Sequence, residues 1–401
     1  MSKCNITNKK LKSLISFGKM PLANGFLNKK DFKSEKFYEL KVGFNEKISL
    51  FQILDIPKFS NTIYKNYPFF THKSRFMIKH FDNCAKWLKN NFLDSNSNLI
   101  EIGSNDGTML KNFRDTSINA FGIDPSKNVA NYANKKGIRT LSFFFNYKNR
   151  NKLKKYKNNT KVVFAANVFC HIKDLIDVIK CIDYLLTNDG YFIFEEPYLG
   201  SMYKNVSYDQ LYDEHIYMFS INSILKIFSL HNFKLIDAIK QETHGGSIRY
   251  ILSRKTNGII ENKNISKFLK YEDKHDISNS DGCLKFKENC LISKDKILRK
   301  LKLLKKQNKK ICGYGATAKS TTVLNYCNIG TNFIDCIFDT SKEKINKFSP
   351  GMHIPIISMD KFKNNYFDYS YLFAWNHKKE IFNKEKIFIK NGGKWLSHVK
   401  I

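Results

Sequence analysis

Apolar strands alternate with helical segments along most of this chain, and this alternation limits the possible folds more than any other feature. Four apolar runs are predicted to be buried strands: "NLIEIGSNDG", "AFGIDPS", "KVVFAANVF" and "YFIFEEP". Helical sequences lie between them, including "RFMIKHFDNCAKWLKNNF", "TMLKNF" and "CHIKDLIDVIKCIDYLL". Strands and helices in this order predict a parallel, doubly wound α/β sheet.

The chain is too long for a single domain. It has 401 residues, whereas one hydrophobic core rarely organises more than about 250–300. A second αβ unit begins near residue 310 with "KKICGYGATAKSTTVLNY", and short strand-like pieces fill the first 66 residues. We therefore expect an N-terminal β-rich module (1–66), a central Rossmann-like domain (67–255), and a helical connector with a second Rossmann-like domain (256–401).

The formal net charge of +32 suggests nucleic acid as a partner, but its distribution argues against that. Only seven of the 68 basic residues are arginine, the side chain on which base readout mostly depends. The lysines are spread over the whole chain. Their densest run, 294–310, places Ile297, Leu298, Leu301 and Leu304 at helical spacing, which predicts an amphipathic helix with solvated lysines. No nucleic-acid partner is expected.

Neither a membrane nor an oxidising compartment is indicated. No charged and apolar leader opens the chain, and no apolar run reaches the ~20 residues that span a bilayer. The nine cysteines form no CxxC pair, so we expect free thiols in a cytoplasmic protein. The sequence does not define the oligomeric state, and a monomer is compatible with it.

The turn "EIGSNDG" is the first candidate ligand site. Gly103 and Gly107 allow close backbone approach at the carboxyl end of a strand. The G-x-x-x-G spacing is not that of a pyrophosphate binder, and Glu101 and Asp106 would repel a pyrophosphate. A cationic adenosine ligand suits these acids, and Asp124 is placed to hold two ribose hydroxyls. These features favour S-adenosylmethionine, and the alternative is a purely structural turn.

Two polar residues follow the next predicted strand in "NVFCHI". Asn167 and His171 are expected to face the same cleft, because the carboxyl ends of parallel strands meet at one edge of the sheet. Adenine edges and reacting groups usually lie there. A histidine just beyond a strand is also often a helix cap or a packing residue, so His171 alone does not decide between these roles.

A second glycine turn, "GYGATA", supports a rival hypothesis. With Asp339 about twenty residues further on, it fits a dinucleotide fingerprint loosely. Taken alone it would indicate an NAD-dependent oxidoreductase or epimerase. Lys319, near the start of the following helix, would instead suit a diphosphate. A purely structural sheet is the third interpretation.

Eight stretches in order resemble the sugar-nucleotide C-methyltransferases, three-domain enzymes that add a methyl branch to a nucleotide-linked 4-keto-deoxy sugar. They cover nearly the whole chain: "LISFGKMPLANGFL", "EIGSNDG", "NVFCHI", "YDEH", "HGGSIRY", "GYGATAKSTTVLNYC", "SPGMHIPI" and "AWN". The resemblance implies that the "EIGSNDG" loop, including Asn105, binds S-adenosylmethionine. It further implies that the C-terminal domain holds a nucleotide sugar without a redox cofactor.

The resemblance also assigns the active site. It implies catalytic roles for Tyr212, Glu214 and His215 of "YDEH", with His171 facing them. Methylating a carbon next to a ketone needs a base and a stabilised enolate oxygen, and histidine titrates near neutral pH. His215 is therefore the expected base, with Tyr212 and His171 available to the oxyanion. Either Glu214 or Asp213 is expected to orient the imidazole or to hold substrate hydroxyls.

Further substrate contacts and one departure from the family pattern remain. The expected substrate-binding residues are Tyr67, Arg249, Lys319 and Asn376, while Phe69 replaces a second expected tyrosine. The family's N-terminal module usually holds zinc with two CxxC knuckles. Here they are "CNIT" (4–7) and "NEKI" (45–48), which retain only the first of four thiols. A tetrahedral zinc site needs four good ligands, so we expect no zinc and assign no metal ligands.

The sequence thus predicts a methyltransferase that uses S-adenosylmethionine to methylate a carbon next to the keto group, most simply C3, of a nucleotide-linked 4-keto-deoxy sugar. The product would be a branched-chain sugar of a deoxysugar pathway. The alternatives are an NAD-dependent nucleotide-sugar oxidoreductase or epimerase, and a methyltransferase with another small acceptor. The sequence does not define the sugar or the nucleotide.

Overall fold

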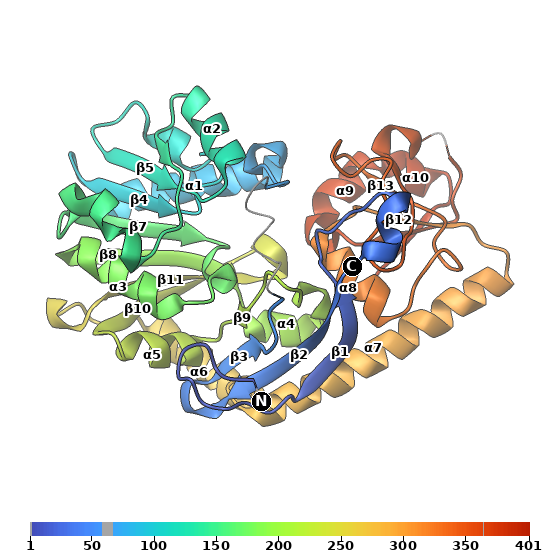
Figure 1. Cartoon of the computed structure of the whole chain (residues 1–401), viewed down its shortest axis with the longest axis horizontal. Coiled ribbons are helices and arrows are strands. Elements are labelled where there is room, and N and C mark those ends of the chain that lie inside the picture. Colours follow the sequence, from blue (N-terminus) through green and yellow to red (C-terminus); the bar gives the residue numbers. More distant parts are fainter. Residues whose placement is uncertain (1, 58–66, 364) are drawn as a thin grey trace.

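The computed structural model describes residues 2–57, 67–363 and 365–401, so the expected boundary at residue 66 lies outside the described residues. Three sheets organise this part of the chain (Figure 1). The N-terminal sheet is antiparallel in the order β1-β2-β3-β9. Its strands are β1 (Ile15–Pro21), β2 (Phe37–Asn45), β3 (Leu50–Ile53) and β9 (Tyr217–Met218). Because β9 directly follows "YDEH", the N-terminal module packs beside the candidate active site.

The central sheet has seven strands in the order β10-β11-β8-β7-β4-β5-β6. Its parallel strands are β4 (Asn98–Ile102), β5 (Asn119–Ile123), β6 (Thr140–Leu141), β7 (Thr160–Ala166) and β8 (Leu186–Pro197). The helices of this part are α1 (Arg75–Phe92), α2 (Lys127–Lys135), α3 (Leu175–Leu185), α4 (Leu199–Asn205), α5 (Ile221–Ser229) and α6 (Lys263–Lys274). The predicted cofactor residues Gly103, Asp124 and Asn167 directly follow β4, β5 and β7, and Glu101 lies within β4.

The C-terminal sheet is entirely parallel, in the order β14-β13-β12-β15-β16. Its strands are β12 (Ile311–Tyr314), β13 (Ile337–Asp339), β14 (Ile356–Ser358), β15 (Tyr369–Leu372) and β16 (Lys394–Leu396). Its helices are α8 (Ala318–Tyr326), α9 (Lys378–Lys384) and α10 (Lys386–Lys390). The predicted α/β class and the two Rossmann-like sheets are confirmed.

The lysine-rich segment lies in α7 (Ser280–Lys306), a long helix that runs beneath the N-terminal sheet toward the C-terminal domain (Figure 1). Ile297, Leu301 and Leu304 are buried, and Leu298 packs against the same core. That core also contains residues of β1, β2 and α8, so it joins the N-terminal module to the C-terminal domain. The predicted amphipathic helix is confirmed.

Two predicted elements differ from the structure. The segment 108–113 was expected to be a helix, but only a short 3₁₀ turn forms, Leu110–Phe113. The Thr108 amide and hydroxyl both donate to the Asp106 carboxylate, a local bond that competes with helix initiation. The central sheet is also not wholly parallel, because β10 (Phe233–Gln241) and β11 (Ser247–Arg254) extend it as an antiparallel hairpin.

The N-terminal module has other side chains at three of the four positions where the resemblance would place zinc ligands. Cys4 and Ile48 are buried, and the Asn45 amide donates to the Thr7 hydroxyl at 2.8 Å. One thiol, one hydroxyl, one amide and one alkyl side chain do not make a tetrahedral zinc site. This module is therefore held by apolar packing and side-chain hydrogen bonds.

We expect metal analysis of the purified protein to find well below one zinc per chain. The physical reason is the donor set: a single thiol cannot hold the ion that four thiolates hold. Chelator treatment should leave the thermal unfolding midpoint unchanged. Stoichiometric zinc that resists dialysis would contradict this interpretation of the module.

All nine cysteines are free, as expected, and all are buried, where a thiol packs as a small apolar group. In the described part of the chain, no helix has both the length and the apolarity needed to cross a bilayer.

Candidate active site

The first glycine turn lies at the carboxyl end of β4, beside the ends of β5 and β7. Gly103 and Gly107 have φ values of +65° and +77°, a region that favours glycine. A Cβ atom on Gly103 would lie 2.3 Å from the Val168 side chain. The turn therefore requires glycine for its backbone angle and for the approach of the segment after β7.

Asn105 and Asp106 hold this turn to its neighbours. The Asn105 amide N–H donates to Asp124 Oδ2 at 3.0 Å, and its side-chain amide donates to the Phe69 carbonyl at 3.1 Å. Asp106 Oδ2 accepts the His72 backbone N–H at 2.9 Å and lies 2.8 Å from His72 Nδ1. The structure thus brings Asn105, Asp106 and Asp124 together, and it fixes the segment just before α1 against them.

Several buried polar atoms around this turn have no hydrogen-bond partner among the described residues. They are Glu101 Oε2, Ser104 Oγ and Asn167 Oδ1. Burial raises the pKa values of Glu101 and Asp124, and neighbouring acids add to both shifts. Unsatisfied acceptors at the carboxyl ends of adjacent strands fit a ligand that brings N–H and O–H donors. The amino group and ribose hydroxyls of S-adenosylmethionine are such donors.

His215 is buried, at 5% exposure, and both of its ring nitrogens have partners. Nδ1 lies 2.8 Å from the Gln210 carbonyl, so it must carry the proton and donate. Nε2 is then an acceptor, and the Tyr212 hydroxyl donates to it at 2.6 Å. We expected Glu214 or Asp213 to orient the imidazole. Among the described residues, Gln210 and Tyr212 do so instead, because the chain turns tightly between 210 and 215.

Burial also changes the titration of these groups. Burial, and then the neighbouring His171, His244 and Lys319, lower the pKa of His215 well below 6.5. His215 is therefore a neutral imidazole at neutral pH, rather than the near-neutral titrating group that we expected. Burial and then the neighbouring Asp213 raise the pKa of Glu214 to about 8. Burial also raises the pKa of Asp213 to about 6, so the two acids of "YDEH", and not its histidine, titrate near neutral pH.

Glu214 and His171 complete this cluster. The Asn24 side-chain amide donates to Glu214 Oε1 at 2.6 Å, and Glu214 Oε2 lies 4.0 Å from His171 Nδ1. The His171 and His215 rings are perpendicular, with centroids 5.0 Å apart. Burial lowers the pKa of His171 to about 4, so it too is neutral. The four predicted catalytic side chains therefore lie together.

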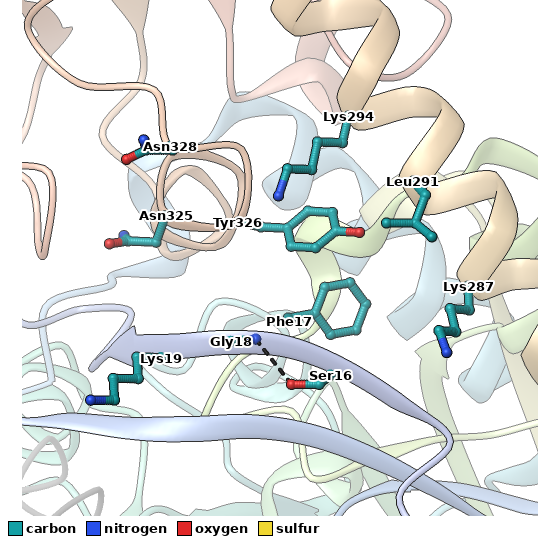
Figure 2. A pocket seen from close by; sticks show the side chains of 10 residues that line it. All are labelled: Ser16, Phe17, Gly18, Lys19, Lys287, Leu291, Lys294, Asn325, Tyr326 and Asn328. Atoms are coloured by element: carbon teal, nitrogen blue, oxygen red, sulfur yellow. Dashed lines mark hydrogen bonds between the residues drawn. The ribbon is translucent and has the colours of Figure 1, made fainter.

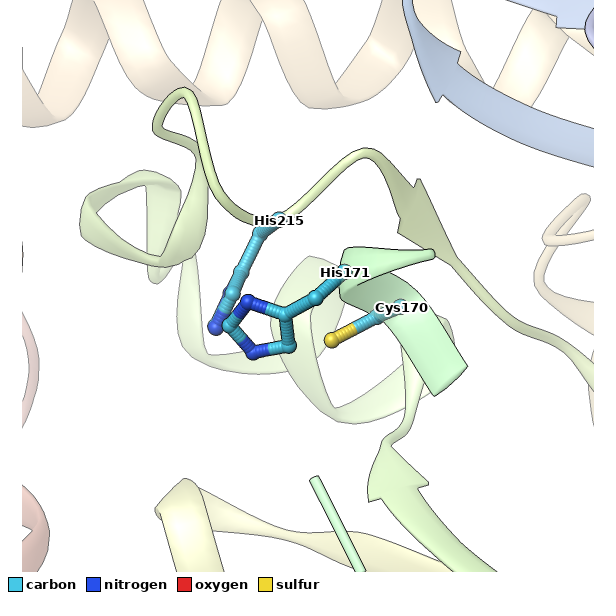
Figure 3. A group of neighbouring side chains, drawn as sticks. All are labelled: Cys170, His171 and His215. Atoms are coloured by element: carbon cyan, nitrogen blue, oxygen red, sulfur yellow. The ribbon is translucent and has the colours of Figure 1, made fainter. Parts of the chain in front are cut away.

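Cys170, His171 and His215 also form a possible metal-binding group. Their potential ligand atoms lie within 4.8 Å of one another, and Figure 3 shows the two rings side by side next to the thiol. Both nitrogens of His215 are already hydrogen-bonded, and tetrahedral zinc needs ligand atoms at about 2.0–2.3 Å from the ion. We therefore assign no metal to this group.

A cavity of about 470 Å³ opens beside Glu214. Asn24 and Phe26 of the N-terminal module, Tyr67 and Asn128 of the central domain, and Lys344 of the C-terminal domain line it together with Asp213 and Glu214. Tyr212, His171 and His215 are not among its lining residues. Sequence analysis missed Asn24 and Lys344. Asn24 lies within the quoted stretch "LISFGKMPLANGFL", which was used only as a family signature.

The other predicted substrate residues lie in different surroundings. Arg249 forms a buried ion pair with Glu195, with Nη2 and Oε1 2.5 Å apart. Asn376 is half-buried in the 3₁₀ turn Trp375–His377. The Lys319 ammonium is buried without a hydrogen-bond partner among the described residues, 5.0 Å from the Trp375 ring centre. Only Tyr67 of this set lines the cavity.

A second cavity, of about 520 Å³, lies between β1, α7 and the end of α8 (Figure 2). Lys19, Lys287 and Lys294 surround an aromatic floor formed by Phe17 and Tyr326. It shares no lining residue with the cavity at Glu214.

Two of the quoted motifs meet at the boundary between the central and C-terminal domains. A Cβ atom on Gly245 of "HGGSIRY" would lie 2.1 Å from the ring of Trp375 in "AWN". Trp375 Nε1 donates to Asp209 Oδ2 at 2.6 Å, just ahead of "YDEH". This contact fixes the C-terminal domain against the segment that carries His215.

Gly245→Ala is expected to weaken this boundary. The residue has φ +82°, which strains alanine, and its methyl group would displace the indole. We expect a loss of roughly 2–4 kcal/mol in unfolding free energy and lower activity, measured by urea unfolding and turnover. Gly258→Ala is the matched control. Gly258 also has a positive φ, +67°, but a Cβ atom added there would meet no neighbouring atom of the described residues within 4 Å. Equal effects of both substitutions would contradict the role of the Trp375 contact.

The raised carboxyl pKa values predict a pH-dependent stability. Burial raises the pKa of Glu196 to about 7 and that of Glu214 to about 8. Between pH 6.5 and 8 the folded protein therefore still holds protons that the unfolded chain has released. Since it loses them as pH rises, the free energy of unfolding falls toward pH 8. The buried histidines change the pH dependence of the unfolding free energy only below about pH 6.5, because their pKa values in the folded protein are lowered. We expect a loss on the order of 1–2 kcal/mol between pH 6.5 and 8.

Urea unfolding across this pH range measures that loss. Glu214→Gln should flatten the profile, because glutamine does not titrate. A Glu214→Gln profile as steep as that of the unchanged protein would show that another group causes the slope.

Comparison with known proteins defines the class of enzyme and shows which proteins the chain is similar to. Residues 73–238 match the model of a methyltransferase domain, and residues 242–399 match the model of a C-methyltransferase C-terminal domain. The C-methyltransferase NovU of Streptomyces niveus is 27% identical over 388 residues, which cover 96% of this chain and 91% of that protein. The class is therefore that of the methyltransferases.

Two solved structures resemble the chain over less than half of its length. An S-adenosylmethionine-dependent methyltransferase from Archaeoglobus fulgidus is 12% identical, with a TM-score of 0.35 over 44% of this chain and 94% of the other. A second, from Aquifex aeolicus, is 15% identical, with a TM-score of 0.33 over 44% and 98%. Structural similarity at this level adds nothing to the sequence comparisons.

The chain resembles the sugar C-methyltransferases along most of its length, and it is an S-adenosylmethionine-dependent C-methyltransferase. The resemblance found in the sequence motifs is thereby confirmed, and methyl transfer is selected over the nicotinamide-dependent alternative.

Proposed function

We propose that this enzyme methylates the carbon next to the keto group, C3, of a 4-keto-deoxy sugar linked to a nucleoside diphosphate. The observation that carries the proposal is the cavity at Glu214, which all three parts of the chain line. Glu214 and Asn24 offer hydrogen bonds to sugar oxygens on one side. Lys344 and Lys347 offer positive charge to a diphosphate on the other.

Methyl transfer to carbon requires removal of a proton from that carbon, and the adjacent ketone stabilises the resulting enolate. Bound S-adenosylmethionine supplies an electrophilic methyl group. Glu101, Gly103, Asn105, Asp106, Gly107, Asp124 and Asn167 are the residues that would hold it. Asp124 is proposed for the ribose hydroxyls, and Glu101 and Asn167, with their unsatisfied acceptors, for its donors.

His215 is proposed as the base, and because it does not line the cavity at Glu214, the proposal requires the side chains between them to move so that the reacting carbon reaches Nε2. Its donation from Nδ1 to Gln210 leaves Nε2 as the proton acceptor, and its lowered pKa keeps the ring neutral at physiological pH. The Tyr212 hydroxyl must turn away from Nε2 before that atom can accept the substrate proton, and Tyr212 and His171 are then proposed to donate hydrogen bonds to the developing enolate oxygen. The removed proton would reside on Nε2 as the carbon–methyl bond forms.

Glu214 is a second candidate for the base. It faces the cavity, and its pKa of about 8 is closer to the optimum for a general base than that of His215. In the assignment favoured here, Glu214 binds a sugar hydroxyl and compensates the positive charge that forms on His215.

The remaining substrate contacts are assigned by their position. Tyr67 lines the cavity and is proposed to contact the sugar. Lys319, which has no hydrogen-bond partner among the described residues, and the half-buried Asn376 do not line the cavity, so they are proposed to contact the part of the nucleotide sugar that extends beyond Lys344 and Lys347. Arg249 is proposed to act only indirectly, because its ion pair with Glu195 already satisfies it.

Turnover of a panel of dTDP-, GDP- and CDP-linked 4-keto-deoxy sugars tests the proposal. We expect product mass to increase by one methylene unit with at least one sugar, and the new methyl signal to appear on the carbon next to the ketone by NMR. Reduced sugars that lack the ketone should not react. Methylation of a reduced sugar at the same rate, or of oxygen instead of carbon, would overturn the proposal.

A further inference from the structure

Glu196 is a buried carboxylate, close to the end of β8, that the proposed reaction does not use. It is fully buried, and a single oxygen, Oε1, accepts three consecutive backbone N–H groups. The donors are Val168 at 2.9 Å, Phe169 at 2.6 Å and Cys170 at 3.2 Å. Successive N–H groups converging on one oxygen form a specific anion-binding arrangement.

These three N–H groups belong to the turn that carries His171. The 3₁₀ turn Phe169–His171 follows β7 and has no side-chain cap of its own. The same turn contacts the second histidine, because the Cys170 carbonyl accepts the backbone N–H of Ile216 at 2.9 Å. Glu196 therefore holds one short segment from which both catalytic-site histidines take their positions.

Burial of a carboxylate here is costly, and a leucine would fill the same space without that cost. The second oxygen, Oε2, has no hydrogen-bond partner among the described residues. Strands β7 and β8 are already joined by their backbone bonds. The carboxylate is thus not needed to pair the strands, and its distinctive contacts are those with the turn at 168–170.

We propose that Glu196 is a positioning residue that fixes the turn at 168–171 and so sets the relative positions of His171 and His215. Its effect on activity rests on the roles proposed above for those histidines. Its effect on the positions of the two histidines does not depend on those roles.

The chain offers a matched control. Glu272 of α6 is also fully buried and also accepts two consecutive backbone N–H groups, those of Ile221 at 2.6 Å and Asn222 at 3.0 Å. These groups start α5. Substitution of Glu272 removes a carboxylate that binds backbone N–H groups, without touching the turn at 168–171.

The test compares Glu196→Leu, Glu196→Gln and Glu272→Leu by ¹H–¹⁵N spectra of histidine-labelled protein and by steady-state kinetics. Substitutions of His171 and His215 assign the two signals. We expect Glu196→Leu to shift both signals and to lower kcat by roughly 10- to 100-fold, with the KM for S-adenosylmethionine unchanged. Glu196→Gln keeps an acceptor oxygen and should retain wild-type signals and kcat within about threefold.

Glu272→Leu should lower the thermal midpoint yet leave both histidine signals and kcat unchanged. The proposal is overturned if Glu196→Leu leaves both signals in place, or if Glu272→Leu shifts them equally. If the wild-type enzyme turns over no keto sugar, the proposed function fails, while the histidine signals still decide the role of Glu196. If Glu196→Leu does not fold, Glu196→Asp decides: its shorter side chain should shift both signals, and unshifted signals overturn the proposal.

Discussion

His215→Ala lowers kcat by roughly 10²- to 10⁴-fold, the range that a general base contributes, while the dissociation constant of S-adenosylmethionine stays within about twofold. The reason is structural separation. The imidazole contacts Tyr212 and Gln210, whereas the predicted cofactor residues lie at the ends of β4, β5 and β7. Single-turnover kinetics and calorimetric titration measure the two quantities independently.

His231→Ala is the control for the loss of an imidazole, because His231 lies in the loop between α5 and β10, outside the cluster at "YDEH". It should leave both quantities unchanged. If His215→Ala weakens cofactor binding and catalysis in parallel, the residue supports the fold of the site and is not the base.

Asp124→Ala should have the opposite signature. We expect the dissociation constant of S-adenosylmethionine to rise by about 10- to 100-fold. Truncating one partner of a buried, charge-assisted hydrogen bond costs about 2–5 kcal/mol. Part of that cost already falls on the free protein, and only the remainder weakens cofactor binding. Much of kcat should return at saturating cofactor. The carboxylate also accepts the N–H groups of Asn105 and Ser126, so the substitution loosens the glycine turn as well.

The second Rossmann-like sheet supplies the control for this experiment. Asp339 is the last residue of β13, much as Asp124 directly follows β5, and it likewise accepts backbone N–H groups from its glycine turn, at Ala316, and from Ser341. Asp339→Ala should leave cofactor affinity unchanged. Equal weakening by both substitutions would place the cofactor elsewhere or show that the effect is one of stability.

Local patterns predicted the elements of the fold well. The helix 75–92 has its apolar residues on one face and a serine cap, so its bounds follow from the sequence alone. The glycine turns could be placed because positive φ and close packing demand glycine. The antiparallel hairpin of β10 and β11 was missed, because its pairing with β8 joins residues that are 50 to 62 positions apart in the sequence.

The candidate site was predicted by residue type but not by environment. The four side chains of "YDEH" and "NVFCHI" meet as expected, yet their pKa values depend on burial by distant segments. Glu214 contacts Asn24 of the N-terminal module, and Lys344 comes from the C-terminal domain. Glu196 was quoted only as part of a strand. The adjacent acids Glu195 and Glu196 stand at the end of a buried strand, and this pattern indicates that each carboxylate needs a hydrogen-bonding or charged partner.

Proton exchange at the sugar carbon is the most direct measurement of the central claim. The enzyme is incubated in heavy water with a nucleotide-linked 4-keto sugar and S-adenosylhomocysteine, which cannot donate a methyl group. We expect deuterium to appear at the carbon next to the ketone with the wild-type enzyme and not with His215→Ala. Wild-type exchange rates in His215→Ala would contradict the account.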